Sequence, residues 1–203
     1  MSIDGFMAGP SQDEAHPLGI GGEPLHEWVF ATRTGRALIG SPGGDTGVDE
    51  EFVSAGFEGI GATIMGRNMF GPVRGDWVSP AWPGWWGENP PFHHDVFVLT
   101  NHPRASLPME GGTTFHFVTD GPEAALERAR EAAGESDIRL GGGAETLRRY
   151  LGLGLVDTMH VAMVPVLLGA GERLFDGATG PVLYRCDSFH PSERVVHFQF
   201  VPS

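Results

Sequence analysis

Two short segments of the sequence place glycine beside groups that bind phosphate. Gly66-Arg67-Asn68 follows an apolar, β-branched run at 60–65, and Gly141-Gly142-Gly143 follows the short apolar segment 138–140. Glycine lets the backbone contact a ligand closely, and both guanidinium groups and the N–H groups at a helix start favour anionic oxygens. The two segments therefore indicate a phosphate-bearing ligand. Two simpler interpretations stay open: a tight turn at the three glycines and a surface ion pair at Arg67.

A third segment of this kind ends the continuous apolar run 96–100. It contains Leu99, Thr100 and Asn101, and Arg104 follows shortly after. Parallel strands present their carboxyl ends at one edge of a sheet, and open α/β sheets bind ligands at that edge. Together the three segments predict an extended ligand that carries several phosphates.

Other kinds of chemistry find little support in the sequence. It contains no dinucleotide-binding GxGxxG fingerprint, no P-loop and no GxSxG nucleophile elbow. Cys186 falls in an expected strand and is interpreted as a buried structural thiol. His93 and His94 are adjacent and would point to opposite sides of a strand, so no metal site is expected.

The elements that must position these segments alternate between strands and helices. Helical patterns cover about 48–58, 123–133 and 144–151, and Pro122 and Gly134 bracket the second of them. Strands are expected at 60–65, 96–100, 114–119, 138–140, 157–168, 181–189 and 194–201, with a turn at 190–193. This order predicts an α/β fold: a central, mostly parallel sheet with an antiparallel C-terminal hairpin and helices on both faces, in one domain over 1–203.

The segment Gly71–Phe92 differs from its surroundings. It holds four tryptophans and five prolines, and prolines exclude regular structure there. Long ordered loops often carry function. The alternative is that the tryptophans anchor the loop to the body or form a subunit contact.

Composition excludes several classes of partner. The 203-residue chain has a formal net charge of −13, and all its basic residues are arginines, so it repels nucleic acid and anionic membranes. A single cysteine fits a reducing cytoplasm. No apolar run approaches the length of a membrane helix, which is about 18 residues.

Four motifs in order carry a resemblance to a known family. Ser2-Ile3-Asp4-Gly5-Phe6-Met7-Ala8 resembles the start of the reductase domain of bacterial riboflavin biosynthesis, and Met65-Gly66-Arg67 resembles a motif of dihydrofolate reductase. The segments 140–145 and 165–175 resemble the glycine turn and the P-V-L-L-G segment of the same group. The chain thus resembles a stand-alone bacterial member of the dihydrofolate-reductase-like superfamily, of the RibD C-terminal type.

The resemblance implies NADPH as the cofactor, bound at the segments described above. Gly66, Arg67 and Asn68 would hold its phosphates or its 2′-phosphate. Leu99, Thr100 and Asn101 would border its adenosine, and Arg104 would be a second candidate for the 2′-phosphate. Ala8 would cover the nicotinamide. The pyrophosphate would be held by the segment of Leu140, Gly141, Gly142, Gly143, Ala144, Glu145 and Thr146.

The resemblance also implies a reaction and candidates for its proton donor. The substrate would be a small pterin- or aminopyrimidine-like heterocycle, as in 5-amino-6-(5-phosphoribosylamino)uracil reductases. Gly169 and Gly171 would line its site. From its residue type and its helix-like spacing within 17–31, Trp28 could stack on the heterocycle, although core packing is the simpler role for it. The family's spacing selects Glu50 and its neighbour Asp49 as acids, with Asp4 and Glu27 as rivals.

Structural roles compete with these assignments of the acids. A carboxylate at the start of a helix interacts favourably with the helix dipole, and this is a sufficient role for Asp49 and Glu50. Asp4 lies in an Asp-Gly turn, where it can simply stabilise the turn. The superfamily further implies a homodimer that pairs through the edge strands of the C-terminal hairpin. The alternative to a reductase is a non-catalytic nucleotide-binding or assembly protein that retains the fold.

Overall fold

The computed structural model describes residues 1–71, 75–77, 79, 82–177 and 182–203. Parts of the predicted loop Gly71–Phe92 and the first residue of the predicted strand 181–189 therefore lie outside the described residues. Two compact units make up the chain. Unit 1 comprises Met1–Gly56 and Arg148–Ser203, and unit 2 comprises Phe57–Leu147.

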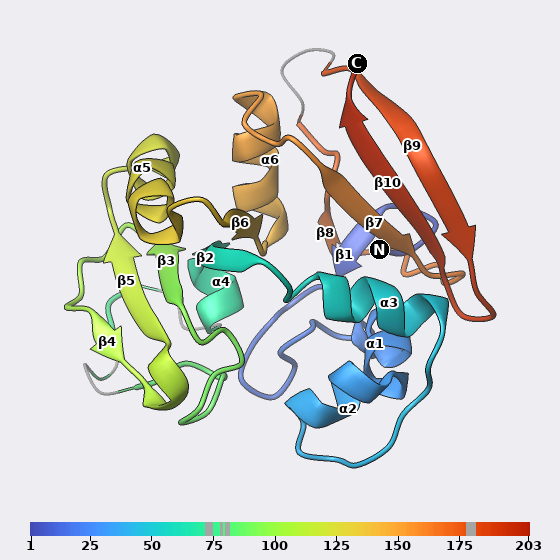
Figure 1. Ribbon diagram of the computed structural model, residues 1–203, viewed down its shortest axis with the longest axis horizontal. Helices are drawn as coiled ribbons and strands as arrows, with labels where there is room; N and C mark the ends of the chain where they lie inside the picture. Colours follow the sequence, from blue (N-terminus) through green and yellow to red (C-terminus); the bar gives the residue numbers. More distant parts are fainter. Residues whose placement is uncertain (72–74, 78, 80–81, 178–181) are drawn as a thin grey trace. The chain divides into compact units, whose positions relative to one another are not determined.

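Unit 2 is built on a five-stranded sheet with the order β4-β5-β3-β2-β6 (Figure 1). Four of its strands run parallel, and the short edge strand β4 is antiparallel to β5. The strands are β2 (Ile60–Gly66), β3 (Asp95–Leu99), β4 (Leu107–Pro108), β5 (Thr114–Val118) and β6 (Asp137–Leu140). The predicted central, mostly parallel sheet is thus confirmed.

One helix of unit 2 packs against this sheet through small side chains. Helix α5 (Pro122–Ala133) lies along β2 and β3 (Figure 1). It begins with proline at its first position and ends at Gly134, as predicted. Ala125, Ala129 and Ala133 recur every fourth residue and are buried, so one face of the helix approaches the sheet closely.

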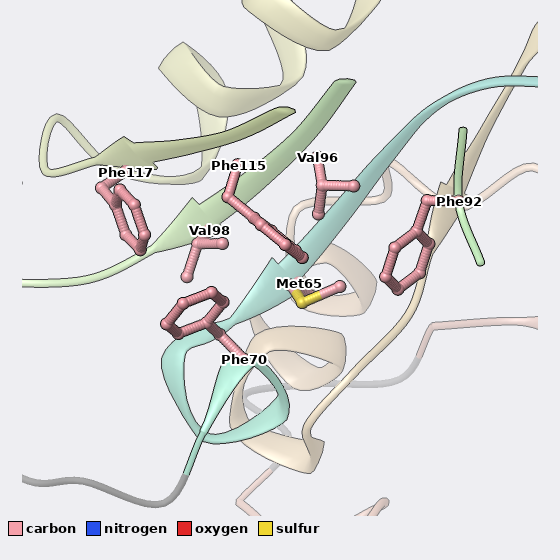
Figure 2. Close-up of a cluster of buried hydrophobic side chains, with 7 residues drawn as sticks. All are labelled: Met65, Phe70, Phe92, Val96, Val98, Phe115 and Phe117. Carbon is pink, nitrogen blue, oxygen red and sulfur yellow. The ribbon is translucent and has the colours of Figure 1, made fainter. Parts of the chain in front are cut away.

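Aromatic residues fill the core beside the same strands. Figure 2 shows seven buried side chains gathered together: Met65, Phe70, Phe92, Val96, Val98, Phe115 and Phe117. Trp77, Trp82 and Trp86 of the tryptophan-rich loop pack against this cluster. Phe70, from the short helix α4 (Arg67–Phe70), meets Trp77 and Trp82 edge to face, with ring centroids 5.9 and 5.7 Å away. The described part of the loop is therefore anchored to the body of unit 2.

Unit 1 contains the predicted antiparallel C-terminal hairpin. Strands β9 (Tyr184–Pro191) and β10 (Val196–Pro202) pair with each other, and β10 also pairs with β7 (Met159–Met163). A second pair joins β1 (Phe6–Ala8) to β8 (Glu172–Arg173). The helical elements of this unit are η1 (Glu23–Leu25), α1 (Glu27–Ala31), α2 (Arg33–Leu38) and α3 (Val48–Ala55), and η2 (Glu110–Gly112) belongs to unit 2.

The three-stranded sheet of unit 1 has two different faces. Val161, Phe198 and Phe189 occupy matched positions on β7, β10 and β9, so they share one apolar face. This face borders a cavity of about 350 Å³. His197 and His190 are matched positions of the other face. Strand alternation thus separates an apolar side from a histidine-bearing side.

Three details differ from the sequence-based expectations. Strand β7 covers five residues of the predicted 157–168, because the chain leaves the sheet at Val164 and forms a single parallel bridge to Ser2. The turn of the hairpin lies later than predicted, where Ser192 accepts the N–H groups of Arg194 and Val195. The prediction that Cys186 is buried is wrong: it is exposed, as are most residues of β9, because little of the protein covers this strand.

Candidate functional site

The carboxyl ends of β2, β3 and β6 lie together in unit 2. Gly66 is in register with Leu99 of β3, and Ile64 is in register with Leu140 of β6. In the sheet β2 lies between β3 and β6, so the chain continues from β2 to β3 on one side and β6 pairs with β2 on the other. The crevice beyond such neighbouring strands is where open α/β sheets bind ligands. All three predicted phosphate-binding segments follow these strands.

Bare backbone brings the first two segments into contact. The N–H of Gly66 donates to Gly142 O at 2.6 Å, and the N–H of Gly141 donates to Ile64 O at 2.8 Å. A Cβ atom at Gly66 would overlap Thr146 Oγ1, so the close approach needs glycine. Gly142 has φ +113°, a conformation that other residues rarely adopt. A Cβ atom at Gly143 would meet no atom within 4 Å, which leaves one side of the turn open.

Helix α6 (Ala144–Gly152) begins directly after this turn. Gly143 O accepts the N–H of Leu147, so Ala144, Glu145 and Thr146 form the first turn of the helix. The first N–H groups of a helix have no partner within it and carry a partial positive charge. Backbone of this kind suits an anionic oxygen next to the glycine turn.

Two arginines lie around one indole ring beside the end of β2. The Cζ atom of Arg67 is 3.9 Å from the centroid of Trp77, and that of Arg104 is 5.0 Å away. The Arg104 Nη2 atom also donates to Trp82 O at 2.7 Å. Burial, and then the charge of Arg67, lower the pKa of the Arg104 guanidinium. The structure thus concentrates positive charge at one place in an acidic chain.

The segment after β3 is tied to the tryptophan-rich loop. His102 O accepts the indole N–H of Trp77 at 3.0 Å, and the His102 N–H donates to the buried Thr100 Oγ1 at 3.1 Å. Asn101 lies exposed between them, and Asn68 is half-buried on α4. These bonds fix the position of Trp77 relative to the carboxyl end of β3.

Asp4 of unit 1 fixes a loop of its own unit. Its two carboxylate oxygens accept the N–H groups of Leu168 at 3.1 Å and Gly169 at 2.7 Å. A hydrogen bond from the Ser2 side chain, with help from these N–H groups, lowers the pKa of Asp4 to about 2. At neutral pH this group is a carboxylate and holds no proton to donate.

The other two candidate acids also have structural partners in unit 1. Glu50 accepts the N–H of Thr34 at 2.9 Å and its hydroxyl at 2.8 Å, and the backbone bond is the main cause that lowers the pKa of Glu50. Asp49 Oδ1 lies 3.0 Å from Nε2 of the buried His197. Glu50 thereby supports the start of α2, and Asp49 links α3 to β10.

The predicted substrate-side residues occupy two places in unit 1. A Cβ atom at Gly171, which has φ +136°, would overlap Ala8 O, so the loop before β8 lies directly against β1. Gly169 is joined to Asp4, as described above. Trp28 is buried and meets His197 edge to face at 5.0 Å. Trp28 also lines a cavity of about 210 Å³ with Glu27.

A family model for the RibD C-terminal domain matches residues 1–198. The chain belongs to this family. The match extends over both units and includes every candidate residue named above. A search of the curated proteins finds no match.

Solved structures show the same fold at low sequence identity. A protein from Shewanella sp. PV-4 that is named for riboflavin biosynthesis shares 21% identity, with 100% of this chain and 95% of that one covered and a TM-score of 0.61. A deaminase/5-amino-6-(5-phosphoribosylamino)uracil reductase from Thermotoga maritima shares 13% identity at a TM-score of 0.58. The alignment covers all of this chain but 54% of the Thermotoga chain.

Dihydrofolate reductase from Enterococcus faecalis, solved with NADP(H), is also similar. It shares 16% identity over 78% of this chain and 84% of that one, with a TM-score of 0.50. The predicted dihydrofolate-reductase-like fold is thereby confirmed.

Sequence reasoning missed two features of these sites. The tryptophan-rich loop is visible in the sequence, but no spacing indicates that Trp77 lies against Arg67. The contact of His197 with Asp49 joins residues 148 positions apart and left no local signal. Among the residues that the structure describes, no group of three metal-ligating side chains could hold an ion, and no helix is long and apolar enough to cross a membrane.

Proposed function

We propose that this protein is an NADPH-dependent reductase that transfers a hydride to a small heterocyclic substrate. The observation that carries the proposal is the convergence in unit 2 of Gly66, the glycine turn 141–143 and the two arginines around Trp77. Bare amides and guanidinium groups are the donors that a dinucleotide's phosphates require. When bound, NADPH supplies the hydride from its nicotinamide ring.

Each part of this region has a distinct task in the proposal. The amides of Gly141–Gly143 and of the first turn of α6 bind the pyrophosphate. Arg67 and Arg104 bind the 2′-phosphate, with Asn68 beside them. Leu99, Thr100 and Asn101 border the adenosine at the end of β3. Leu140 positions the turn through its pairing with β2.

The substrate class rests on the family. The name of the Thermotoga maritima relative includes a 5-amino-6-(5-phosphoribosylamino)uracil reductase, which supports an aminopyrimidine or pterin substrate here. In the proposal Gly169 and Gly171 line the substrate, Trp28 stacks against it and Ala8 covers the nicotinamide. An aromatic side chain suits the flat face of such a heterocycle.

The reaction also needs a proton, and Glu27 is the candidate that the cavities favour. Asp4, Glu50 and Asp49 each hold a hydrogen bond that positions another segment. Glu27 lines the cavity of about 210 Å³ beside Trp28. A carboxyl group in a cavity can deliver a proton directly or through a held water molecule.

The decisive experiment is a binding and turnover assay on the intact chain. Tryptophan fluorescence during titration with NADPH measures binding, because Trp77 lies among the proposed phosphate ligands. Arg67→Gln and Arg104→Gln should weaken NADPH binding. Arg130→Gln, on the exposed face of α5, is the matched control and should not. Absence of NADPH binding at millimolar concentration would contradict the proposal.

Turnover separates this function from its alternative. Oxidation of NADPH is followed with 5-amino-6-(5-phosphoribosylamino)uracil and with dihydrofolate. Three of the candidate acids already hold hydrogen bonds that position other segments. This observation favours a second candidate function, a nucleotide-binding protein without catalysis. NADPH binding with no oxidation on any pterin or pyrimidine would support that alternative.

A further inference from the structure

Arg173 is held over an aromatic ring directly after the loop that carries Gly169 and Gly171. It lies opposite Phe6 where β8 pairs with β1, and its Cζ atom is 4.3 Å from the centroid of that ring. Cross-strand neighbours of this kind contact each other directly. Phe6 is buried, whereas Arg173 is exposed. The buried ring therefore supports a guanidinium group that reaches solvent.

A second arginine reaches the same short strand from helix α6, and both arginines belong to unit 1. Arg148 Nη1 donates to the backbone oxygen of Arg173, and Arg173 Nη1 donates to Asp4 O at 2.9 Å. The Asp4 carboxylate is engaged elsewhere, because it accepts the N–H groups of Leu168 and Gly169. Both arginines are thus positioned by neutral carbonyl groups rather than by a carboxylate.

This arrangement is unusual in a chain with 26 acidic and 13 basic residues. Three other arginines pair with an aspartate: Arg128 with Asp120, Arg185 with Asp187 and Arg194 with Asp45. Among the residues that the structure describes, no carboxylate pairs with Arg148 or Arg173, and their Nε and Nη2 groups hold no hydrogen bond. Arg173 is exposed, and the Arg148 nitrogen atoms are not fully buried. Both groups therefore keep N–H donors for an anion.

We infer that Arg148 and Arg173 form a binding site for a phosphate monoester carried by the substrate. Two guanidinium groups supply forked N–H donors and two positive charges, which match the oxygens and the charge of a phosphate dianion. The site lies next to Gly169 and Gly171, which the proposed function places at the substrate. The identity of the ligand rests on that proposed function. The site makes the enzyme prefer a phosphorylated heterocycle over the same heterocycle without phosphate.

The test compares kcat/KM for 5-amino-6-(5-phosphoribosylamino)uracil with kcat/KM for its dephosphorylated form, 5-amino-6-ribosylaminouracil. Arg148→Gln and Arg173→Gln should each lower kcat/KM for the phosphorylated substrate by about 10- to 100-fold and leave that for the other form nearly unchanged. Arg148→Lys and Arg173→Lys keep the charge but lose the forked donors, so their losses should be smaller. Arg185→Gln removes the same charge from β9 and is the matched control, which should keep the wild-type preference.

Two binding measurements identify the source of the phosphate. Calorimetric titration with inorganic phosphate should show weaker binding to Arg148→Gln and Arg173→Gln than to wild type. The dissociation constant for NADPH should be the same in wild type and in both variants. A rise of that constant in these variants would show that the two arginines bind the cofactor, and it would overturn the inference.

The remaining outcomes separate the inference from the proposed function. A wild type that oxidises NADPH with both substrates equally well overturns the inference alone, as does an equal loss on both substrates in the Gln variants. A wild type that oxidises no NADPH overturns the proposed reductase. Phosphate binding then decides the site: weaker binding in the Gln variants supports it, and equal binding overturns it. If a Gln variant does not fold, the Lys variant at that position decides by the same comparisons.

Discussion

The buried imidazole of His197 donates its Nε2–H to Asp49 Oδ1 at 3.0 Å. The Asp49 carboxylate only accepts hydrogen bonds, so the other nitrogen of a neutral His197, Nδ1, is an acceptor. His160 Nε2 lies 2.9 Å from that nitrogen and is therefore the donor. Phe52 stacks on both rings, with centroids 4.2 Å from His197 and 4.6 Å from His160. The network thus fixes the tautomers of both histidines in their neutral forms.

This network predicts a loss of stability in mild acid. His160 as a whole is exposed, but its ring packs on Phe52 and His197, and this desolvation lowers its pKa from 6.5 to about 4. Burial is the main cause that lowers the pKa of His197. Between these pH values the unfolded chain binds more protons than the folded chain. The free energy of unfolding should therefore be highest above pH 6.5 and fall as the pH falls toward 4.

Urea unfolding across this pH range measures the effect. His160→Gln keeps a side-chain N–H donor for His197 but does not titrate, so its pH dependence should be flatter. His16→Gln, which removes a histidine of the same unit whose partner is Asp13, is the control. If the free energy of unfolding changes equally with pH in wild type and His160→Gln, the network does not contribute to the pH dependence.

The contact between Gly66 and Thr146 predicts a rescue between two substitutions. Gly66→Ala places a methyl group against Thr146 Oγ1 and should destabilise the protein by about 1–3 kcal/mol, as overpacking typically does. Thr146→Ala removes that oxygen, so the double variant should recover most of the loss. Thermal unfolding of the four proteins gives the coupling energy, and strictly additive effects would contradict the contact.

Gly143→Ala tests whether the glycine turn binds the cofactor. The added methyl group enters open space, so the melting temperature should change little while the NADPH dissociation constant rises. An unchanged dissociation constant would contradict a role of this turn in binding.

Asp4 predicts a second acid transition at lower pH. Its pKa of about 2 lies below the ordinary 3.8, so its stabilising effect is complete above 3.8 and is lost as the pH falls toward 2. Asp4→Asn should lower the melting temperature at neutral pH, because an amide nitrogen cannot accept the N–H of Gly169. Glu14→Gln, on an exposed loop of the same unit, is the control. Equal melting temperatures for wild type and Asp4→Asn would contradict the bracing role.

Glu27 predicts a change in rate rather than in cofactor binding. Removal of a general acid typically lowers a rate by about 10²–10⁴-fold, and Glu27→Gln should lower kcat within that range. Its NADPH dissociation constant should match wild type. A kcat close to wild type would exclude Glu27 as the proton donor.

The structure offers a second surface for the predicted homodimer besides the hairpin's edge strand: the apolar face of the three-stranded sheet. Phe189 is 64% exposed there, and its ring lies 6.4 Å from that of Phe198. Exposed apolar faces of this kind commonly pair across a two-fold axis. Light scattering should give a dimer for wild type and a monomer for Phe189→Glu. Arg185→Gln on the same strand should stay dimeric, and a monomeric wild type would contradict the prediction.

Most of the fold could be predicted because its signals are local. The apolar run at 60–66, the proline and glycine that bracket α5 and the alternation along β10 each determine an element within a few residues. Their order then allows few sheet topologies. Strand ends were less predictable: β7 stops where the chain bridges to Ser2, a contact across the whole sequence.

The candidate site was predictable only in part, for the same physical reason. Glycine beside Arg67 is visible in the sequence, and so is glycine before a helix. The stacking of Arg67 on Trp77 depends on how a proline-rich loop folds back, which no periodicity encodes. The exposure of Cys186 likewise depends on how little of the protein covers β9, whereas its residue type favours burial.

The solvent-facing thiol on β9 allows the protein to be labelled at a single site. Because the chain has one cysteine, a maleimide fluorophore would attach at Cys186 on the hairpin, and no other cysteine would have to be replaced first. The same atom makes the purified protein sensitive to air, since oxidation can join two molecules covalently and imitate a dimer. Light-scattering measurements on this protein therefore require a reducing agent throughout.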